Sequence, residues 1–459
     1  MDIEIKRALA EIVGSGNFTD DLIDLISYSS DASEERHRPE AAVWPRTTAD
    51  VSAILKLANE KRLPVIPRGA GTGLSGMAVP IKGGLILDLI RMNRIVKISL
   101  EDRLAVVQPG VVYADLQKAL EPYGYFFPPD PASGSVATLG GNVATNAGGM
   151  KGAKYGTTRD YVLGLEVVLA DGSVLRAGSS CMKCVSGYEL ARIFIGSEGT
   201  LGVITEITLK INPKPLAVAT GTACFDDLAQ AGRSVSAIMR SGIIPSVLEF
   251  LDQETLRAIN RTAGLGLEET AAMILAETDG FTPAEADFQM DRLVETLKAN
   301  GAAAVTRAGS PREAERFWKA RRSVFNALSS LDRNLLVEDV TVPLSRITDM
   351  LLGLKEIGRR RHLRLAILGH LGDGNFHPNI MYDGSDPDQA GRAELAVEDI
   401  FKLSIELGGT LTGEHGIGLT KARFMPLEHG PTALRVMNAL KRTLDPNGIL
   451  NPGKMGLEL

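Results

Sequence analysis

Apolar residues recur along the chain with helical or strand spacing, and stretches rich in glycine and proline separate these runs. Near the N-terminus, the apolar spacing predicts short helices at Ile3–Val13 and Asp20–Ile26, the second capped by Thr19. Thr47–Asp50 resembles a capping box and predicts a helix over 51–61. Strands are expected at 41–44, 85–89, 106–107, 162–169, 174–177 and 203–211, and a helix at 112–120.

The run Asn212-Pro213-Lys214-Pro215 interrupts this pattern and marks a domain boundary. Beyond it, the order strand, helix, strand occurs twice, over 217–225, 228–240 and 247–251, and again over 273–277, 284–299 and 303–306. This order fits a split, ferredoxin-like sheet. The expected elements that follow are helices at 312–331, 347–360 and 432–444, and strands at 335–343, 365–368 and 376–381.

Three glycine-rich stretches interrupt the first part of the chain, at 64–80, 128–156 and 195–202. Such stretches let backbone N–H groups approach a ligand closely, with phosphate as the usual recipient. Gly71–Gly76 satisfies G-x-G-x-x-G, but Pro80 and two glycines follow where a dinucleotide-binding turn needs a helix. The first stretch therefore predicts a phosphate loop between strands. For the second, a ligand wrap is favoured over a linker, because its apolar residues indicate burial.

Composition narrows the function classes for a chain of this length. The 459 residues carry a net charge of −6, with 44% hydrophobic and 23% charged residues and no basic block, which argues against a nucleic-acid partner. Three cysteines are too few for a disulfide framework and suggest a reducing compartment. No apolar run approaches the roughly 20 residues of a membrane helix. We expect a soluble, cytoplasmic protein of two or three domains.

The spacing C-x-x-C occurs once, at Cys181 and Cys184. One pair cannot complete a zinc or iron–sulfur site without ligands from elsewhere, and no redox-motif context surrounds it. Two incidental thiols are the favoured interpretation.

Three of the six histidines fall close together, His370 and His377 in GHLGDGNFHPN and His415 in GEHGIG. Each alone is more often a satisfied core or surface histidine. Together with Glu414, two imidazoles and a carboxylate make a site for a divalent metal, and zinc, manganese, iron and cobalt all suit it. His415 would then be placed to take a proton. Arg321 and Arg322 suit a substrate carboxylate, although a solvated helix face explains them as well.

Six motifs in series, RGAGTGLSG, PPDPASGSVATLGGNVATNAGG, GSEGTLG, GHLGDGNFHPN, GEHGIG and LNPGKM, resemble the vanillyl-alcohol-oxidase-type flavoproteins. The similarity is greatest to the branch that holds FAD-dependent D-lactate dehydrogenases, glycolate oxidase large subunits and D-2-hydroxyglutarate dehydrogenases. It implies an α+β fold. An FAD-binding domain would span 1–213, joined by the tail 426–459, and a ferredoxin-like substrate domain with the metal site would span 214–425.

The resemblance also implies roles for individual residues. His415 would act as base, Arg321 and Asn379 would contact substrate, and His370, His377 and Glu414 would hold the metal. The residues expected to bind FAD are Arg68, Gly69, Ala70, Gly71, Thr72, Gly73, Ser75, Gly76, Pro131, Ser133, Thr138, Gly141, Asn142, Asn146, Gly148, Glu198, Gly199, Ile204 and Asn451.

Departures from the family pattern refine the expectation. Thr72 stands where some relatives tether FAD through histidine, and the second loop has no cysteine, so FAD should be non-covalent. By this resemblance, Phe325 and Val337 stand where relatives that take hydroxyglutarate have threonine and lysine. D-Lactate or glycolate is therefore favoured over D-2-hydroxyglutarate as the acid oxidised to its 2-keto acid.

Other functions and the partners stay open at this point. A metal-dependent hydrolase and a non-redox FAD transferase are the alternatives from other classes. The implied electron acceptor is a quinone, a cytochrome, an electron-transfer flavoprotein or an iron–sulfur subunit. The chain would form a homodimer or a hetero-oligomer, in the cytoplasm or peripheral to the inner membrane through a partner.

Overall fold

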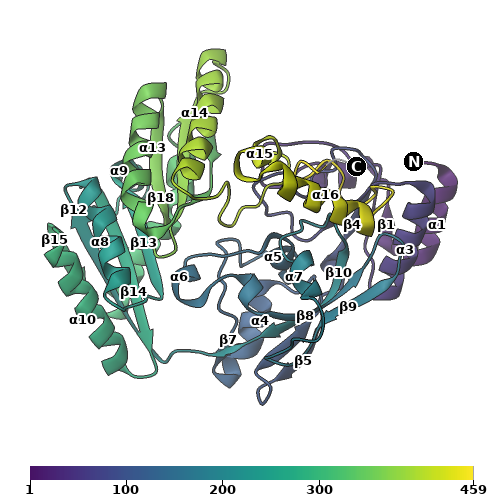
Figure 1. Cartoon of the computed structure of the whole chain (residues 1–459), viewed down its shortest axis with the longest axis horizontal. Coiled ribbons are helices and arrows are strands. Elements are labelled where there is room, and N and C mark those ends of the chain that lie inside the picture. The colour runs from purple at the N-terminus through teal and green to yellow at the C-terminus, as the bar shows by residue number, and fades with distance from the viewer. Residues whose placement is uncertain (458–459) are drawn as a thin grey trace. The chain divides into compact units, whose positions relative to one another are not determined.

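The computed structural model describes residues 1–457, which divide into two compact units (Figure 1). The first unit contains residues 1–149, 157–214 and 414–457, and the second contains 150–156 and 215–413. The domain bounds expected from sequence stay a prediction. The two units differ from these bounds in two places, because residues 150–156 belong to the second unit and residues 414–425 to the first.

Two sheets build the first unit. The smaller sheet has the strand order β1-β2-β4-β3, from Phe18–Thr19, Ala41–Val43, Leu85–Asp88 and Val65–Arg68. β2 and β3 both run parallel to β4. The helices beside this sheet are α1 (Ile3–Val13), α2 (Leu22–Ser27) and α3 (Thr48–Lys61). The capping box that the sequence predicts at Thr47 and Asp50 is present, and the apolar face of α3 is buried.

The larger sheet of the first unit is antiparallel. Its strand order is β5-β6-β10-β8-β9, from Ile95–Ser99, Leu104–Val107, Val203–Lys210, Val162–Val168 and Val174–Gly178. A two-stranded pair joins β7 (Tyr125–Phe126) to β11 (Asn212–Pro213). The remaining helices are α4 (Tyr113–Leu120), α5 (Leu139–Thr145), α7 (Leu190–Phe194), α15 (Met425–Glu428) and α16 (Pro431–Leu444). α4, α5 and α7 contribute Leu116, Val143 and Phe194 to one core with this sheet.

One antiparallel sheet organises the second unit. Its strand order is β15-β12-β14-β13-β18-β19-β16, and β17 also pairs with β19. The strands are β12 (Ala217–Phe225), β13 (Val247–Asp252), β14 (Ala272–Gly280), β15 (Ala304–Arg307), β16 (Asn334–Val337), β17 (Val340–Thr341), β18 (Arg364–His370) and β19 (Asn375–Tyr382). In the order β15-β12-β14-β13, one helix joins β12 to β13 and another joins β14 to β15, and each of these two pairs is separated by another strand, which is the ferredoxin-like order predicted from sequence. β13 and β14, which a third helix joins, pair directly.

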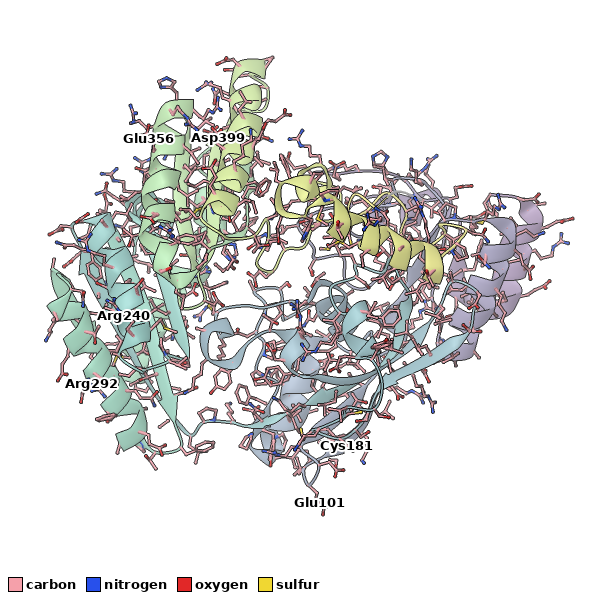
Figure 2. The ribbon with its side chains drawn as sticks, in the orientation of Figure 1. Glu101, Cys181, Arg240, Arg292, Glu356 and Asp399 are labelled. Atoms are coloured by element: carbon pink, nitrogen blue, oxygen red, sulfur yellow. The ribbon has the colours of Figure 1, made fainter. Side chains whose placement is uncertain are left out.

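Two groups of helices accompany this sheet. α8 (Leu228–Arg240) packs against α10 (Pro283–Ala299) and α13 (Ile347–Arg361), and α13 packs against α14 (Pro387–Glu406). Arg360 and Arg361 of α13 both bind Asp399 of α14 at 2.7 Å. Figure 2 labels Asp399 on α14. A second group consists of α9 (Gln253–Ala263), α11 (Pro311–Arg322) and α12 (Val324–Ser329), and α6 (Gly152–Tyr155) also contacts β13.

Several predicted elements differ from the structure. The single helix expected over 312–331 is two helices that meet at Ser323, and the strand expected over 335–343 is two short strands separated by Glu338-Asp339. Asp21, not Thr19, caps α2. α9 and α14 were not expected, nor was α5, which forms within the glycine-rich stretch.

Candidate functional site

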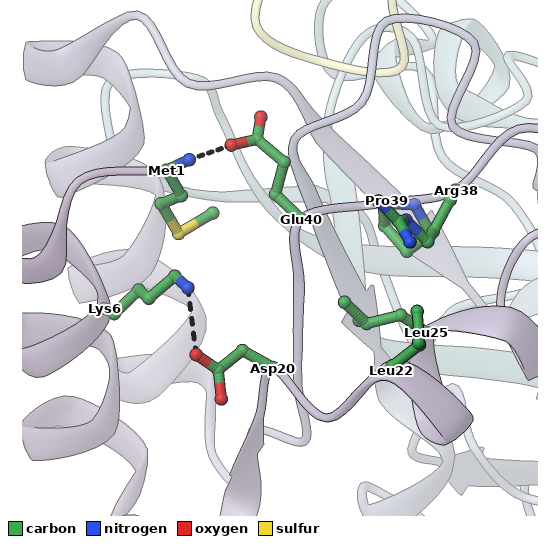
Figure 3. A pocket seen from close by; sticks show the side chains of 8 residues that line it. All are labelled: Met1, Lys6, Asp20, Leu22, Leu25, Arg38, Pro39 and Glu40. Carbon is green, nitrogen blue, oxygen red and sulfur yellow. Dashed lines mark hydrogen bonds and ion pairs between the residues drawn. The ribbon is translucent and has the colours of Figure 1, made fainter.

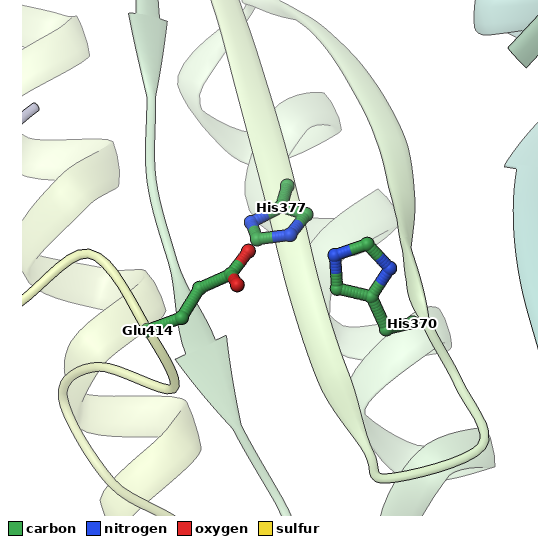
Figure 4. Close-up of side chains that lie close together, drawn as sticks. All are labelled: His370, His377 and Glu414. Carbon is green, nitrogen blue, oxygen red and sulfur yellow. The ribbon is translucent and has the colours of Figure 1, made fainter. Parts of the chain in front are cut away.

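Two histidines and a glutamate lie close together at the ends of two paired strands. His370 ends β18, and His377 on β19 stands opposite Leu368. Their rings are 5.0 Å apart, nearly perpendicular, and each side chain is almost fully buried. One potential ligand atom from each of His370, His377 and Glu414 lies within 4.8 Å of the others (Figure 4).

Asp339 fixes the chain that leads to Glu414. Its carboxylate is buried and accepts hydrogen bonds from the Thr412 hydroxyl at 2.6 Å and the Gly413 N–H at 2.8 Å. It also accepts one from the Asn375 amide at 2.6 Å, and the ring Nδ1 of His377 lies 3.7 Å away. Gly413 is the last residue of the second unit, so these bonds fix the backbone position from which Glu414 follows.

Glu249 lies between a predicted metal ligand and a predicted substrate-binding residue. One carboxylate oxygen contacts the His370 Nδ1, and the other accepts from the Arg321 Nε. Burial would raise the pKa of the Glu249 carboxyl, but electrostatic attraction and hydrogen bonds from His370 and Arg321 outweigh it and hold that pKa below its ordinary value. Arg322, the next residue, instead forms an exposed ion pair with Glu315.

Two other predicted residues occupy different surroundings. The Asn379 side chain is buried on β19 and donates to the His377 carbonyl at 2.7 Å, which ties it to the histidine strand. His415 follows Glu414 and begins a turn that the first unit holds. The Ser75 hydroxyl donates to the Gly416 carbonyl at 3.0 Å and lies 3.3 Å from that of His415.

The first glycine-rich stretch connects β3 to β4 without a helix, as predicted. Arg68 enters it partly buried, with its guanidinium 5.5 Å from the Tyr28 ring centre, and burial lowers its pKa. Gly71 has a φ of +68°, which non-glycine residues rarely adopt. A Cβ on Gly69 would overlap the Thr138 hydroxyl, so the first and second stretches touch within the first unit.

The second stretch folds around α5. Thr138 caps this helix by accepting from the Gly141 N–H at 3.3 Å. Asn142 is 4% exposed, and among residues 1–457 its Nδ2 has no hydrogen-bond partner. Asn146 accepts from the Thr157 hydroxyl and the Arg159 N–H. A buried amide that the protein leaves unpaired suits a site for a polar cofactor.

The third stretch and the C-terminal segment meet at Glu198. Its buried carboxylate accepts from the N–H groups of Ile417 at 2.7 Å and Gly418 at 2.8 Å. Its carbonyl accepts from the Asn451 amide at 2.7 Å, whereas the Asn451 Oδ1 has no partner among the described residues. Burial raises the pKa of Glu198 to about 7 and lowers that of the nearby Lys454 to about 8.

A surface hollow lies beside α1 in the first unit. Met1, Lys6, Asp20 and Glu40 are among the residues that line it (Figure 3). The N-terminal ammonium of Met1 pairs with Glu40, and Lys6 pairs with Asp20, so these four charges are already matched. None of the predicted site residues lines this hollow.

Comparison with protein families decides the assignment. The model of FAD linked oxidases, C-terminal domain, matches residues 214–455, and that of an FAD binding domain matches 39–178. The chain belongs to the FAD-linked oxidases. FAD is therefore its cofactor, and it is an oxidoreductase, which does not favour the hydrolase alternative.

Individual relatives of this FAD-linked oxidase agree with the family model. Glycolate oxidase subunit GlcD of Bacillus subtilis (strain 168) is 43% identical over 98% of this chain and 96% of its own length. D-Lactate dehydrogenase of Anaerostipes hadrus is 37% identical over 92% and 90%. The solved structure of p-cresol methylhydroxylase with substrate bound superposes with a TM-score of 0.83 at 21% identity, over 99% of this chain and 96% of that one. The predicted family and fold class are confirmed.

Two carboxylates at the site of this FAD-linked oxidase were missed by sequence reasoning. Asp339 ends a short interruption between strands, which the sequence does not distinguish from an ordinary turn. Glu249 is the one charged residue in the otherwise apolar run Val247–Leu251. A lone carboxylate in a buried strand needs a partner, and this signal could have found it.

Proposed function

We propose that this FAD-linked oxidase converts a small D-2-hydroxy acid, D-lactate or glycolate, to its 2-keto acid. The names of its relatives support this substrate class. The observation that carries the mechanism is the cluster of His370, His377 and Glu414. His415 directly follows Glu414 in the sequence.

FAD would supply the acceptor for the hydride from C2, and a divalent metal held by His370, His377 and Glu414 would supply polarisation of the substrate hydroxyl. His415 takes the hydroxyl proton as the C=O bond forms. Arg321 binds the substrate carboxylate through its terminal nitrogens, since its Nε is used by Glu249. Asn379 contacts the substrate from the histidine strand.

The donor set fits a divalent metal. Two imidazole nitrogens and one carboxylate leave coordination positions open for substrate, as at catalytic zinc, manganese, iron or cobalt sites. Glu249, which contacts the His370 Nδ1, is the outer carboxylate that such a histidine usually has, and the Asp339 carboxylate lies 3.7 Å from the His377 Nδ1. All five side chains would then serve one site.

The FAD assignment rests on the three glycine-rich stretches and Asn451. Asn142 Nδ2 and Asn451 Oδ1 are buried polar atoms that the cofactor would pair. The hydroxyl of Ser75 and the carboxylate of Glu198 bond to the protein, and Ile204 packs into the core, so these three would meet FAD through their backbone. Thr72 offers no covalent tether, and FAD is non-covalent.

Substrate size follows from two apolar side chains. Val337 stands opposite Asn379 in the sheet, and Phe325 lies two residues into α12. Neither can pair with a second carboxylate, which disfavours D-2-hydroxyglutarate.

Electrons then pass to a separate acceptor, which we take to be a quinone, a cytochrome, an electron-transfer flavoprotein or an iron–sulfur subunit. We further propose that the chain forms a homodimer or a hetero-oligomer, in the cytoplasm or at the inner membrane through a partner. Within residues 1–457, no helix has the length and apolarity needed to cross a bilayer.

The test is anaerobic reduction of the FAD-loaded protein by D-lactate, glycolate, L-lactate and D-2-hydroxyglutarate, each in turn. The proposal expects the yellow flavin colour to bleach fastest with D-lactate or glycolate. Bleaching by none of the four acids would refute the function, and a preference for D-2-hydroxyglutarate would refute the substrate size.

A further inference from the structure

Glu249 holds two functional side chains at once. In the sheet it stands directly opposite His370, on the neighbouring antiparallel strand, and Arg321 reaches it from α11. Its side chain is fully buried, whereas that of Arg321 is 16% exposed. Each carboxylate oxygen is used by a different partner.

The contact with His370 determines which ring nitrogen can bind a metal. An ionised carboxylate only accepts hydrogen bonds, so the His370 Nδ1 carries the hydrogen. The Nε2 then keeps its lone pair and is the nitrogen that ligates. Without Glu249, both tautomers become accessible and the ring loses its fixed orientation.

The contact with Arg321 determines which guanidinium atoms face the substrate. Glu249 engages Nε, and among residues 1–457 neither terminal nitrogen has a hydrogen-bond partner. Two terminal N–H groups suit a carboxylate. Glu249 also offsets the positive charge that Arg321 brings into a mostly buried position.

We propose that Glu249 is a positioning residue that couples metal ligation by His370 to substrate-carboxylate binding by Arg321. The inference rests on the proposed function and deepens it. Glu249 would align His370, which holds the metal at the substrate hydroxyl, with Arg321, which holds the substrate carboxylate.

Glu249→Gln separates the two contacts while nearly keeping the side chain's shape. If the amide oxygen faces His370, the amide N–H₂ faces the Arg321 N–H, and two donors oppose each other. If the amide nitrogen faces His370, it donates to Nδ1, and the hydrogen moves to the nitrogen that should ligate. Either orientation loses one of the two functions.

The experiment measures Mn²⁺ binding to FAD-loaded protein from the electron paramagnetic resonance signal of free Mn²⁺, together with KM and kcat for D-lactate. In Glu249→Gln we expect Mn²⁺ affinity to fall by about 10–100-fold, as for other outer carboxylates, or KM to rise by about tenfold or more. The FAD content should stay that of wild type. Glu249→Asp keeps the charge but is too short for both partners, so one of the two losses should remain.

Glu277→Gln is the matched control. Glu277 lies on the adjacent strand β14, mostly buried, and accepts from the Ser246 hydroxyl at 3.2 Å. This variant should keep Mn²⁺ affinity and KM. The inference is overturned if Glu249→Gln matches wild type in both Mn²⁺ affinity and KM. It is also overturned if Glu277→Gln changes Mn²⁺ affinity and KM as much as Glu249→Gln does, since the effect would then be structural.

The same measurements distinguish a failure of this inference from a failure of the proposed function. A wild-type protein that neither binds Mn²⁺ nor is reduced by D-lactate refutes the function, and the inference with it. A wild-type protein that does both, beside a Glu249→Gln variant with the same affinity and KM, refutes the inference alone.

Discussion

Glu198→Gln should change how the stability of the protein depends on pH. The Glu198 carboxylate accepts from the N–H groups of Ile417 and Gly418, and Lys454 and Lys421 attract its charge. Burial outweighs these effects and raises its pKa from 4.5 to about 7. The folded protein therefore binds a proton between these two pH values that the unfolded chain releases.

The sign and size of the effect follow from linkage. The stabilisation from the protonated carboxyl is fully present below pH 4.5 and is lost as the pH rises through about 7. At about 1.4 kcal/mol per pH unit, the total loss is about 3 kcal/mol. Glutamine does not titrate, so the free energy of unfolding of the variant, relative to wild type, should rise by about 3 kcal/mol over this range.

Urea unfolding at a series of pH values, with saturating FAD, measures this difference. Glu60→Gln, an exposed acid on α3, controls for the general loss of a carboxylate. If the free energy of unfolding of wild type minus that of Glu198→Gln stays constant between pH 4.5 and about 7, Glu198 is ionised over this range in the folded protein. The reasoning from burial would then be wrong.

Three further changes test the site. His415→Ala should slow flavin reduction by D-lactate by about 10²–10⁴-fold while FAD stays bound, and stopped-flow absorbance checks both; near-normal reduction excludes His415 as base. In Gly141→Ala, the nearest described atom to the new Cβ is the Thr138 hydroxyl, at 3.3 Å, so weaker FAD affinity by fluorescence titration, with unchanged melting of the apoprotein, would report contact with the cofactor. The control Gly391→Ala, in helix α14, should leave FAD affinity unchanged. An FAD affinity of Gly141→Ala equal to that of wild type would contradict the assignment. Phe325→Thr combined with Val337→Lys should raise kcat/KM for D-2-hydroxyglutarate relative to D-lactate, and no shift would remove these two side chains from substrate selection.

Local sequence rules predicted the elements whose patterning is strong. The bounds of β12 and α8 agree with the sequence prediction at both ends, because each has a regular apolar period and a clear boundary. α5 was missed because Gly140 and Gly141 disfavour a helix, yet Gly140 packs closely against Pro109. Asp339 divided the predicted strand because its carboxylate turns inward to bind Gly413. Tertiary contacts of this kind leave no local signal.

The candidate site was only partly visible in the sequence. His370, His377 and Glu414 could be named from their motifs, and the structure brings them together. Glu249 contacts residues 121 and 72 positions away, and these pairings depend on the register of β13 with β18 and the placement of α11. The sequence order alone contains neither.

The most direct test compares anaerobic flavin reduction by D-lactate in metal-depleted protein and in the same protein after Mn²⁺ or Zn²⁺ is restored. We expect the metal-depleted protein to keep its FAD and stay yellow with D-lactate, and to bleach once the metal is restored. Equal bleaching in both samples would contradict the metal-assisted oxidation proposed for His370, His377 and Glu414.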